Sequence, residues 1–552
     1  MRIAICISTI LLCVCAAFAA NAPYKIGSSN TVTADPPVPR PHTTPCTVTL
    51  FDNAEFDNFN PYSFTYTPPA NCPGPWQKVV FVANIYVTPG VQYDRTANFW
   101  FGGTNIFFGT TAEPGSNLSP NWVVQTDLTD YSPLFTTTQQ GQADIGNLVN
   151  SQYTGIIYAS AELQFYPIDN SVAPPPRPFD QVLPMTSTPG TVTLTDSTST
   201  LSQTFTLPTN VEAAYLDVFA QSQNDDEFWY TCVPNDLSTE LQSCGNTAFR
   251  EGEITIDGQP AGVAPIYPWI FTGGIDPYLW FPLPGVQTLN FVPYRVNLTP
   301  FAGVLSNGQP HTIALSVFNA NNYFSATATL LLYQDPNNTD LSGAITKNTL
   351  TAAPNPQVIE NIQTQSNGDI TGTVSVTSNR RFTITGYVTK PYGKVTTSLQ
   401  QNINFSSIQG FDITSATYVQ NISQQTTIAS TATQHGGAAT LSTSSQQNWP
   451  LNVDLNIVVN SNGTETQTTT IRQENYNDTT NAKNNVQTQS EAVDNLVNTT
   501  DALQFTSGGF LIGNSGQASS QQYSIFGSNG VCYDVTLTAA NNALTSYTDG
   551  CH

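Results

Sequence analysis

Glycine and proline recur along the whole chain, and this distribution limits what the chain can fold into. The 552 residues include 36 Gly and 38 Pro. Both are unfavourable inside α-helices, so their scatter excludes long helices. Short runs rich in β-branched and aromatic residues lie between turn residues, as at 76–87, 158–166 and 312–333. Such runs predict an all-β fold of tandem antiparallel β-sandwich or jelly-roll domains.

The chain is too long for one hydrophobic core, because domains usually hold about 100–200 residues. A stiff, proline-rich linker at 170–181 predicts a boundary between a first β-sandwich at 45–169 and a second at 182–335. After residue 335 the composition shifts to Ser, Thr, Gln and Asn, while apolar residues still alternate. We therefore expect a further polar, β-rich C-terminal domain over 340–552, with two short helices near 481–500.

The first residues predict the compartment. Arg2 is followed by an apolar run at 3–14 and by Ala17-Phe18-Ala19, a pattern that signal peptidase accepts. We expect a signal peptide at 1–20. The run is shorter than the roughly 20 residues of a membrane span, and no later stretch is long and apolar enough to be one. The sequence therefore predicts a protein that is secreted or held in the lumen of an acidic compartment, such as a lysosome or vacuole.

Cysteine usage fits an oxidising compartment. Of the nine cysteines, Cys6, Cys13 and Cys15 lie in the predicted signal peptide, and an even number remains. These fall in local couples, so the simplest pairing is Cys46–Cys72, Cys232–Cys244 and Cys532–Cys551. Spacing alone does not exclude the other connectivities, of which six cysteines allow 15.

The chain is rich in Asn-x-Ser/Thr sequons, which are acceptors for N-glycosylation in secreted proteins. Their density in the C-terminal third predicts a glycan-coated surface there. The candidate asparagines are Asn117, Asn297, Asn337, Asn404, Asn421, Asn462, Asn477 and Asn498.

Charge is sparse and mostly negative. Charged residues make up 10% of the chain, and the formal net charge is −23 at pH 7. Nucleic acids require basic surfaces, so this composition argues against them as partners. Carboxylates lose charge near pH 4–5, so an acidic compartment would reduce self-repulsion. Solubility alone explains the acidity equally well.

Three stretches of the chain carry motifs in a characteristic order. Residues 46–167 contain CTVTLFDNAEF, GVQYDRTANFWFGG, TTAEP and GNLVNSQYTG; residues 225–230 read DDEFWY; residues 250–332 contain REGEITIDGQPAG and YPWIFTGGIDPYLW. In order and spacing these motifs resemble the peptide-N4-(N-acetyl-β-glucosaminyl)asparagine amidase A family, the acidic peptide:N-glycosidases. The resemblance covers about residues 45–335. Two positions depart from it: Asp276 stands where we expect Asn, and Tyr93 where we expect Phe.

The resemblance implies an amidase that acts on N-glycoproteins and glycopeptides without a cofactor. Such an enzyme hydrolyses the asparagine side-chain amide, so that Asn becomes Asp and the glycan leaves as a glycosylamine. It also implies paired antiparallel β-sandwiches, in agreement with the strand pattern.

Amide hydrolysis needs an activated water, a proton for the leaving nitrogen and donors for the oxyanion. A thiol nucleophile is disfavoured because every cysteine beyond the signal peptide has a partner available. The histidines, His42, His311, His435 and His552, lie near no nucleophile signature, and no cluster has the spacing of zinc ligands. Carboxylates remain, without a metal.

Asp225, Asp226 and Glu227 are consecutive in a chain that is poor in charge. If they lie in a strand, Asp225, Glu227 and Trp229 share one face. An acid beside a Trp is partly desolvated, which raises its pKa and suits a general acid. The alternative is a structural acid cluster that binds Ca²⁺ or caps a helix.

Asp94 and Glu113 complete the candidate acid–base set, which we expect to be Asp94, Glu113, Asp226 and Glu227. On sequence alone, Asp94 and its neighbour Arg95 more often form a structural ion pair. Glu113 lies before a proline in a predicted loop, where catalytic residues often occur.

A second set of side chains is expected to bind the substrate. Arg95 and Arg250 are candidates for the peptide or the oxyanion, and the aromatic residues for stacking on sugars, although core packing explains each aromatic equally well. The set is Arg95, Trp229, Tyr230, Arg250, Trp269, Asp276 and Trp280, with Tyr278 as a further candidate for sugar contact.

Two other functions remain open from the sequence. A non-catalytic carbohydrate-binding sandwich, such as a lectin, would share this composition. A glycoside hydrolase would also use two carboxylates. The carboxylate set is what distinguishes an amidase from a lectin.

Overall fold

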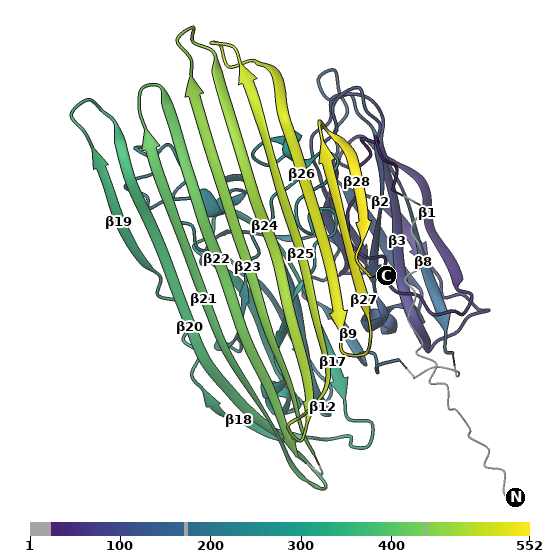
Figure 1. The fold of residues 1–552 in the computed structure, drawn as a ribbon. Helices are drawn as coiled ribbons and strands as arrows, with labels where there is room; N and C mark the ends of the chain where they lie inside the picture. Colours follow the sequence, from purple (N-terminus) through teal and green to yellow (C-terminus); the bar gives the residue numbers. More distant parts are fainter. Residues whose placement is uncertain (1–23, 170–174, 437–438, 552) are drawn as a thin grey trace, which may run out of the picture.

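The computed structural model describes residues 24–169, 175–436 and 439–551. The predicted signal peptide and the first part of the predicted linker lie outside these residues. Almost every regular element is a β-strand, and all strand pairs are antiparallel, which confirms the all-β prediction (Figure 1). Among the helices of the described residues, none has the length and apolar character needed to span a membrane.

The first sandwich is a jelly roll of two 4-stranded sheets, which enclose one hydrophobic core. The long run at 76–87 forms its central strand, as predicted. One sheet has the order β1 (Cys46–Phe56), β8 (Ile157–Pro167), β3 (Trp76–Val87), β6 (Asn121–Asp127). The other has the order β2 (Tyr62–Tyr66), β7 (Gln139–Ile145), β4 (Thr96–Phe101), β5 (Thr104–Thr110).

The second sandwich repeats this strand order, although the sequence shows no internal repeat. Its first sheet runs β10 (Val192–Asp196), β17 (Asn321–Gln334), β12 (Val211–Ser222), β15 (Tyr294–Asn297), with β9 (Gln181–Pro184) added on β17. Its second sheet runs β11 (Leu201–Thr206), β16 (Pro310–Phe318), β13 (Glu251–Ile256), β14 (Gln259–Pro265). The tandem jelly rolls therefore share one topology, which confirms the predicted fold class.

The C-terminal third forms one 11-stranded sheet with strands of up to 21 residues (Figure 1). The two helices predicted near 481–500 are wrong, because this segment forms paired strands in which Lys483 lies opposite Val486. Recurrent Thr and Val and continuous cross-strand pairing favour strands there. The strands are β18 (Ser342–Asn348), β19 (Gln357–Thr364), β20 (Ile370–Lys390), β21 (Gly393–Ile413), β22 (Thr417–Gly436), β23 (Ala439–Val459), β24 (Glu465–Lys483), β25 (Val486–Phe505), β26 (Leu511–Gly527), β27 (Cys532–Ala540) and β28 (Ala543–Asp549).

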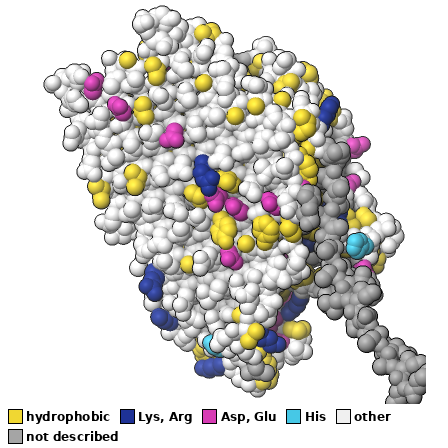
Figure 2. All heavy atoms as spheres, viewed as in Figure 1, with side chains coloured by type: hydrophobic (Ala, Val, Ile, Leu, Met, Phe, Trp, Pro, Cys, Tyr) yellow, Lys and Arg dark blue, Asp and Glu magenta, His cyan; other side chains and the backbone are white. Residues whose placement is uncertain are grey.

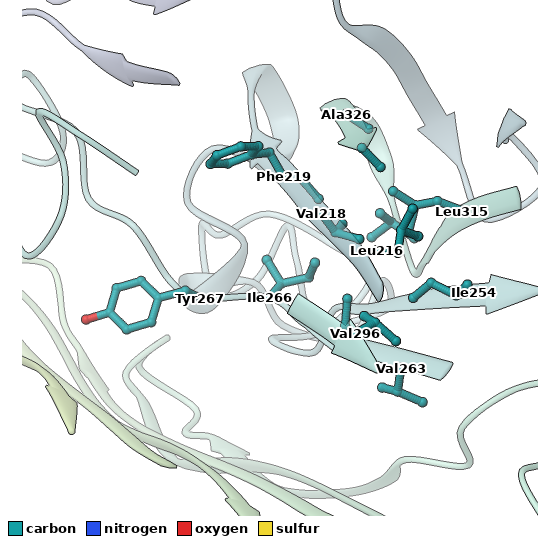
Figure 3. Close-up of a cluster of buried hydrophobic side chains, with 14 of the residues drawn as sticks. Leu216, Val218, Phe219, Ile254, Val263, Ile266, Tyr267, Val296, Leu315 and Ala326 are labelled. Atoms are coloured by element: carbon teal, nitrogen blue, oxygen red, sulfur yellow. The ribbon is translucent and has the colours of Figure 1, made fainter. Parts of the chain in front are cut away.

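One face of this sheet packs on the second jelly roll, so that a single hydrophobic core runs through both. Figure 3 shows part of this core, in which Tyr267 points away from the cluster of aliphatic side chains. Its hydroxyl donates a hydrogen bond to the carbonyl oxygen of Glu474 on β24, 3.1 Å away. The opposite face is largely uncharged and polar (Figure 2).

An N-terminal strap, residues 24–40, ties the sheet to the first jelly roll. Gly27 N–H donates to Leu544 O at 2.7 Å, and Ala34 N–H donates to the side-chain oxygen of Gln521 at 2.7 Å. At its far end, Arg40 donates to the side-chain oxygen of Gln125 at 2.9 Å. The strap therefore joins strands that lie at opposite ends of the sequence.

The disulfide prediction is confirmed: Cys46–Cys72, Cys232–Cys244 and Cys532–Cys551 are bonded. The sequons divide by exposure. Asn117, Asn337, Asn421 and Asn462 are exposed, whereas Asn297, Asn404, Asn477 and Asn498 are partly buried. Glycosylation of either set stays a prediction.

Candidate functional site

Asp94 and Glu113 lie together at the open end of the β4–β5 hairpin. Thr96 on β4 pairs with Thr110 on β5, so residues just before β4 and just after β5 come to the same end of the sheet. The backbone N–H of Asp94 donates to Glu113 Oε2 at 3.1 Å. The hairpin thus brings two of the predicted acids into contact.

Gly273 of the second jelly roll completes this contact. Its N–H donates to Asp94 Oδ2 at 3.0 Å. A Cβ atom at this position would lie 2.2 Å from Glu113 Oε2 and 3.0 Å from Asp94 Oδ1. Only a glycine lets the backbone approach both carboxyl groups this closely.

Glu227 reaches the same place from the end of β12. The strand predicted for residues 225–230 is wrong: the segment forms two 3₁₀ turns, Asn224–Asp226 and Trp229–Thr231. The chain must leave the sheet here, and Asn224 adopts a positive φ of 50°. The three consecutive acids therefore point in different directions, and the predicted pairing of Glu227 with Trp229 on one strand face does not form.

Asp226 is not part of the group. Its side chain is completely buried and pairs with that of Arg250, whose Nε lies 2.8 Å from Asp226 Oδ1. The backbone N–H of Asn321 donates to its other oxygen at 2.5 Å. The structure thus gives Asp226 and Arg250 a buried ion pair that holds the turn in place, and keeps both away from a substrate.

Asp94, Glu113 and Glu227 lie close enough for their charges to act on one another. Burial and the Asp94 carboxylate raise the pKa of Glu113 to about 7, and Glu227 adds to this effect. Burial and Asp94 likewise raise the pKa of Glu227 to about 7. Burial also raises the pKa of Asp94, but the Gly273 N–H and the charge of Arg95 oppose this shift. We call these three residues the carboxyl trio.

Arg95 is the cation beside the trio. Its guanidinium lies over the rings of Tyr93 and Tyr153, 5.8 and 5.9 Å from their centroids. Its Nη1 donates to the backbone oxygen of Asp94 at 3.4 Å, while Nε is buried and finds no acceptor among the described residues. A buried donor without a partner is costly, which suits a group that meets substrate.

The four aromatic side chains that were predicted to bind the substrate lie in the core. Trp229, Tyr230, Trp269 and Trp280 are all at most 6% exposed. Trp280 supports the site instead, since its Nε1 donates to Gly274 O at 2.9 Å. The Tyr230 hydroxyl has no partner among the described residues, and burial and the nearby Glu227 raise its pKa.

Asp276 is buried and pairs with a residue that the sequence did not single out. Its Oδ1 accepts the N–H of Tyr278 at 2.9 Å and caps the turn Pro277–Trp280. Its carboxyl group contacts that of Asp501 on β25, and burial raises the pKa of Asp276 to about 7. Oδ2 of each finds no other partner in the described chain, so a shared proton would satisfy both. Burial raises the pKa of Tyr278, and the charges of this pair and of Glu113 add to the effect.

Sequence reasoning thus missed Gly273, Tyr153 and Asp501. The glycine pair in TGGID was the available signal for Gly273, because adjacent glycines often mark a close backbone approach. Asp501 carries no such signal, since only the docking of the C-terminal sheet brings it to Asp276.

The described residues contain no group of three or more His, Cys, Asp or Glu side chains that could hold a metal ion. His311 is structural, because its Nδ1 lies 2.7 Å from Asp257 Oδ2 at the start of β16. What the trio can do chemically is hold and transfer protons, because burial raises the pKa of all three carboxyl groups.

Fold and site together define a tandem jelly-roll protein with carboxyl groups gathered between its two rolls. Residues 36–351 match the family model described as peptide N-acetyl-beta-D-glucosaminyl asparaginase amidase A. The chain is 30% identical over 395 residues to a peptide-N4-(N-acetyl-beta-glucosaminyl)asparagine amidase A of Prunus dulcis, an alignment that covers 67% of each protein. The chain belongs to this amidase A family, as its motifs predicted.

Two solved structures also show similarity. PNGF-II aligns with a TM-score of 0.38 and 15% identity over 53% of this chain and 65% of its own. PNGase F of Flavobacterium meningosepticum aligns with a TM-score of 0.37 and 13% identity, over 53% of this chain and 96% of its own.

Proposed function

We propose that this protein is a peptide:N-glycosidase that hydrolyses the side-chain amide between asparagine and the first GlcNAc of N-glycoproteins and glycopeptides. The observation that carries the proposal is the carboxyl trio, in which Asp94 and Glu113 of one jelly roll meet Glu227 of the other. Membership of the amidase A family supports it. A lectin would have no need for such a trio.

The trio suggests a division of roles. Asp94 accepts an N–H bond from Gly273 and lies near Arg95, and both favour its charged form. It is suited to accept a proton from water. Glu113 and Glu227, with pKa values raised to about 7, are suited to donate one. A general acid must be protonated at the working pH, and carboxyl groups with a pKa of about 7 are protonated throughout the acidic range.

In this scheme the water oxygen bonds to the asparagine side-chain carbon while Asp94 takes a water proton. The C–N bond then breaks as Glu113 or Glu227 gives a proton to the departing nitrogen. The products are Asp on the peptide and a glycosylamine. Arg95 supplies positive charge for the oxyanion.

A glycopeptide digest at about pH 5 tests the proposal, because a protonated carboxyl donor is available there. Mass spectrometry should show Asp in place of the glycosylated Asn and an intact released glycan. A single GlcNAc left on Asn would instead establish a glycoside hydrolase. An unchanged glycopeptide would favour a carbohydrate-binding protein without catalytic activity.

The proposal extends to the compartment. Three disulfides are typical of proteins that fold in an oxidising environment. Secretion, or retention in an acidic lumen, would agree with them and with a donor that must stay protonated. Expression in a eukaryotic secretory host should deliver the chain to the medium or to such a lumen with a mature N-terminus near residue 21. Retention in the cytosol would contradict this part.

A further inference from the structure

A cavity of about 750 Å³ lies between the turn that follows β12 and the C-terminal sheet; its lining includes chain neighbours of Glu227 and Gly273 but no member of the carboxyl trio. One wall is the turn that carries Glu227, from which Asp225 and Phe228 line the cavity, together with Ile275 from the loop of Gly273. The opposite wall comes from the C-terminal sheet, whose strands β21 to β24 end here. Its volume falls in the range of ligand pockets, about 300–1,000 Å³.

The lining is mixed, but β23 contributes an apolar strip, Leu455, Ile457 and Val459, among polar residues of the neighbouring strands. Tyr418, Leu455 and Ile457 face the cavity and are all partly exposed. The lining includes the carboxylates Asp225 and Glu465 and no Lys or Arg. Sugars are usually held by aromatic faces and dense hydrogen bonding, whereas aliphatic walls fit the apolar side chains of a peptide.

The walls are held in place before any ligand arrives. The Tyr418 hydroxyl donates to Leu241 O at 3.2 Å, and the Gln420 side chain donates to Thr231 O at 3.2 Å. The Cys232–Cys244 disulfide closes the loop that these bonds reach. Ile275 adopts a φ of 66°, which is strained for a β-branched residue. Such strain often marks binding sites.

We propose that this cavity binds the polypeptide that carries the glycan, through apolar residues next to the glycosylated asparagine. This inference rests on the proposed function. The scissile amide joins the glycan to the polypeptide, so both parts of the substrate must extend away from the trio. The cavity lies on one such path, because Phe228, the residue after Glu227, lines it. The C-terminal sheet is then part of the substrate site and sets a preference for apolar flanking sequence.

Two substrates test the inference: a glycopeptide with apolar residues on both sides of the asparagine, and the same glycan on a single asparagine with blocked termini. The double variant Leu455→Ser/Ile457→Ser should lower kcat/KM for the glycopeptide at least tenfold more than for the short substrate, mainly through KM. Asn456→Ser is the matched control, since Asn456 lies between them and faces the outer side of the sheet.

Equal losses on both substrates would assign the cavity to the glycan, and no loss would exclude it from binding; either result overturns the inference. If the wild-type protein cleaves neither substrate, the proposed function is refuted instead.

A second measurement needs no variant. The unglycosylated apolar peptide should inhibit the wild-type protein competitively, and a charged peptide of equal length should inhibit at least tenfold less. Equal inhibition, or none, would contradict the inference.

Discussion

At the scale of single residues, neighbours in sequence have opposite roles. Asp226 points into the core, whereas Glu227 points toward Asp94 and Glu113, because a 3₁₀ turn follows β12. The sequence placed acids at the right positions but could not separate these two. A strand would also have placed Asp226 and Glu227 on opposite faces. Only the fold shows that Arg250 pairs with Asp226 and therefore that Asp226 is structural.

The first prediction separates them by substitution. Glu227→Gln should lower kcat by about 10²–10⁴ with little effect on stability, because it removes a proton donor. Asp226→Asn should destabilise the protein by about 3–5 kcal/mol, because it leaves the Arg250 guanidinium buried without its counter-charge. Kinetics and thermal unfolding of both variants check this. Full activity in Glu227→Gln would remove that residue from the mechanism.

The second prediction concerns pH. Glu113 and Glu227 have pKa values raised to about 7, so the donor is protonated below that pH and is lost above it. Activity should therefore decline as pH rises through about 7, and also at low pH as Asp94 becomes protonated. A kcat/KM profile over pH 3–9 measures both limbs. A rate that keeps rising above about pH 8 would exclude a carboxyl donor.

The third prediction concerns Gly273. Gly273→Ala would place a Cβ atom 2.2 Å from Glu113 Oε2 and must displace that carboxyl group. We expect a fall in kcat of at least tenfold with a much smaller change in KM, since misplacement of a catalytic group costs rate. Gly410→Ala is the matched control, because its Cβ atom would meet no atom within 4 Å and Gly410, like Gly273, does not have a positive φ. Unchanged kcat in Gly273→Ala would show that Glu113 is free to move.

At the scale of elements, strands were predicted well because their signal is local. The alternation of apolar and polar residues located β3, β8, β16 and β17. Strand order was not predictable, since it depends on which distant strands pair. The shared order of the two jelly rolls is invisible in their sequences for the same reason.

The contact between β13 and β20 gives a prediction at this scale. Arg380 on β20 lies 2.9 Å from Glu251 and 3.4 Å from Glu253, both on β13. Arg380→Ala should destabilise the protein by about 3–5 kcal/mol near pH 7, because it leaves the buried Glu251–Glu253 pair without its counter-charge. Burial raises the pKa of both Glu residues, so they become neutral more readily in acid and the loss should be smaller near pH 5.

Arg381→Ala is the matched control for this experiment. Arg381 is the next residue along β20, is exposed, and points to the outer face of the sheet. Denaturant unfolding at both pH values should leave it near wild type. A loss as large as that of Arg380→Ala would show that the effect does not come from the β13–β20 ion pairs.

At the scale of the whole molecule, the C-terminal sheet is integral to the structure. The sequence predicted a separate polar domain over 340–552, and its boundaries stay a prediction, but the hydrophobic core passes from the second jelly roll into the sheet without interruption. Composition does not reveal this shared core, because each strand is polar on average and its few apolar residues form a continuous face only when the strands are aligned in the sheet.

The contact between Asp276 and Asp501 makes the attachment of the sheet depend on pH. Burial raises the pKa of Asp276 to about 7, so the folded protein holds this proton more tightly than the unfolded chain. The stabilisation is complete below about pH 4 and is lost as pH rises through about 7. Asp501→Asn supplies a permanent donor, and the fall in Tm between pH 5 and 8 should shrink. Asp454→Asn, an exposed acid on the outer face, should keep the wild-type fall; equal falls in both variants would exclude the shared proton.

The N-terminal strap has a consequence for biosynthesis. Residues 27 and 34 bond to residues 544 and 521. A ribosome makes residues 27 and 34 long before residues 521 and 544, so this half of the strap stays undocked until β26 and β28 have emerged, whereas Arg40 can bond to Gln125 much earlier. Attachment of residues 27 and 34 is therefore a late event in maturation, which can occur only after the last strands of the C-terminal sheet have been synthesised.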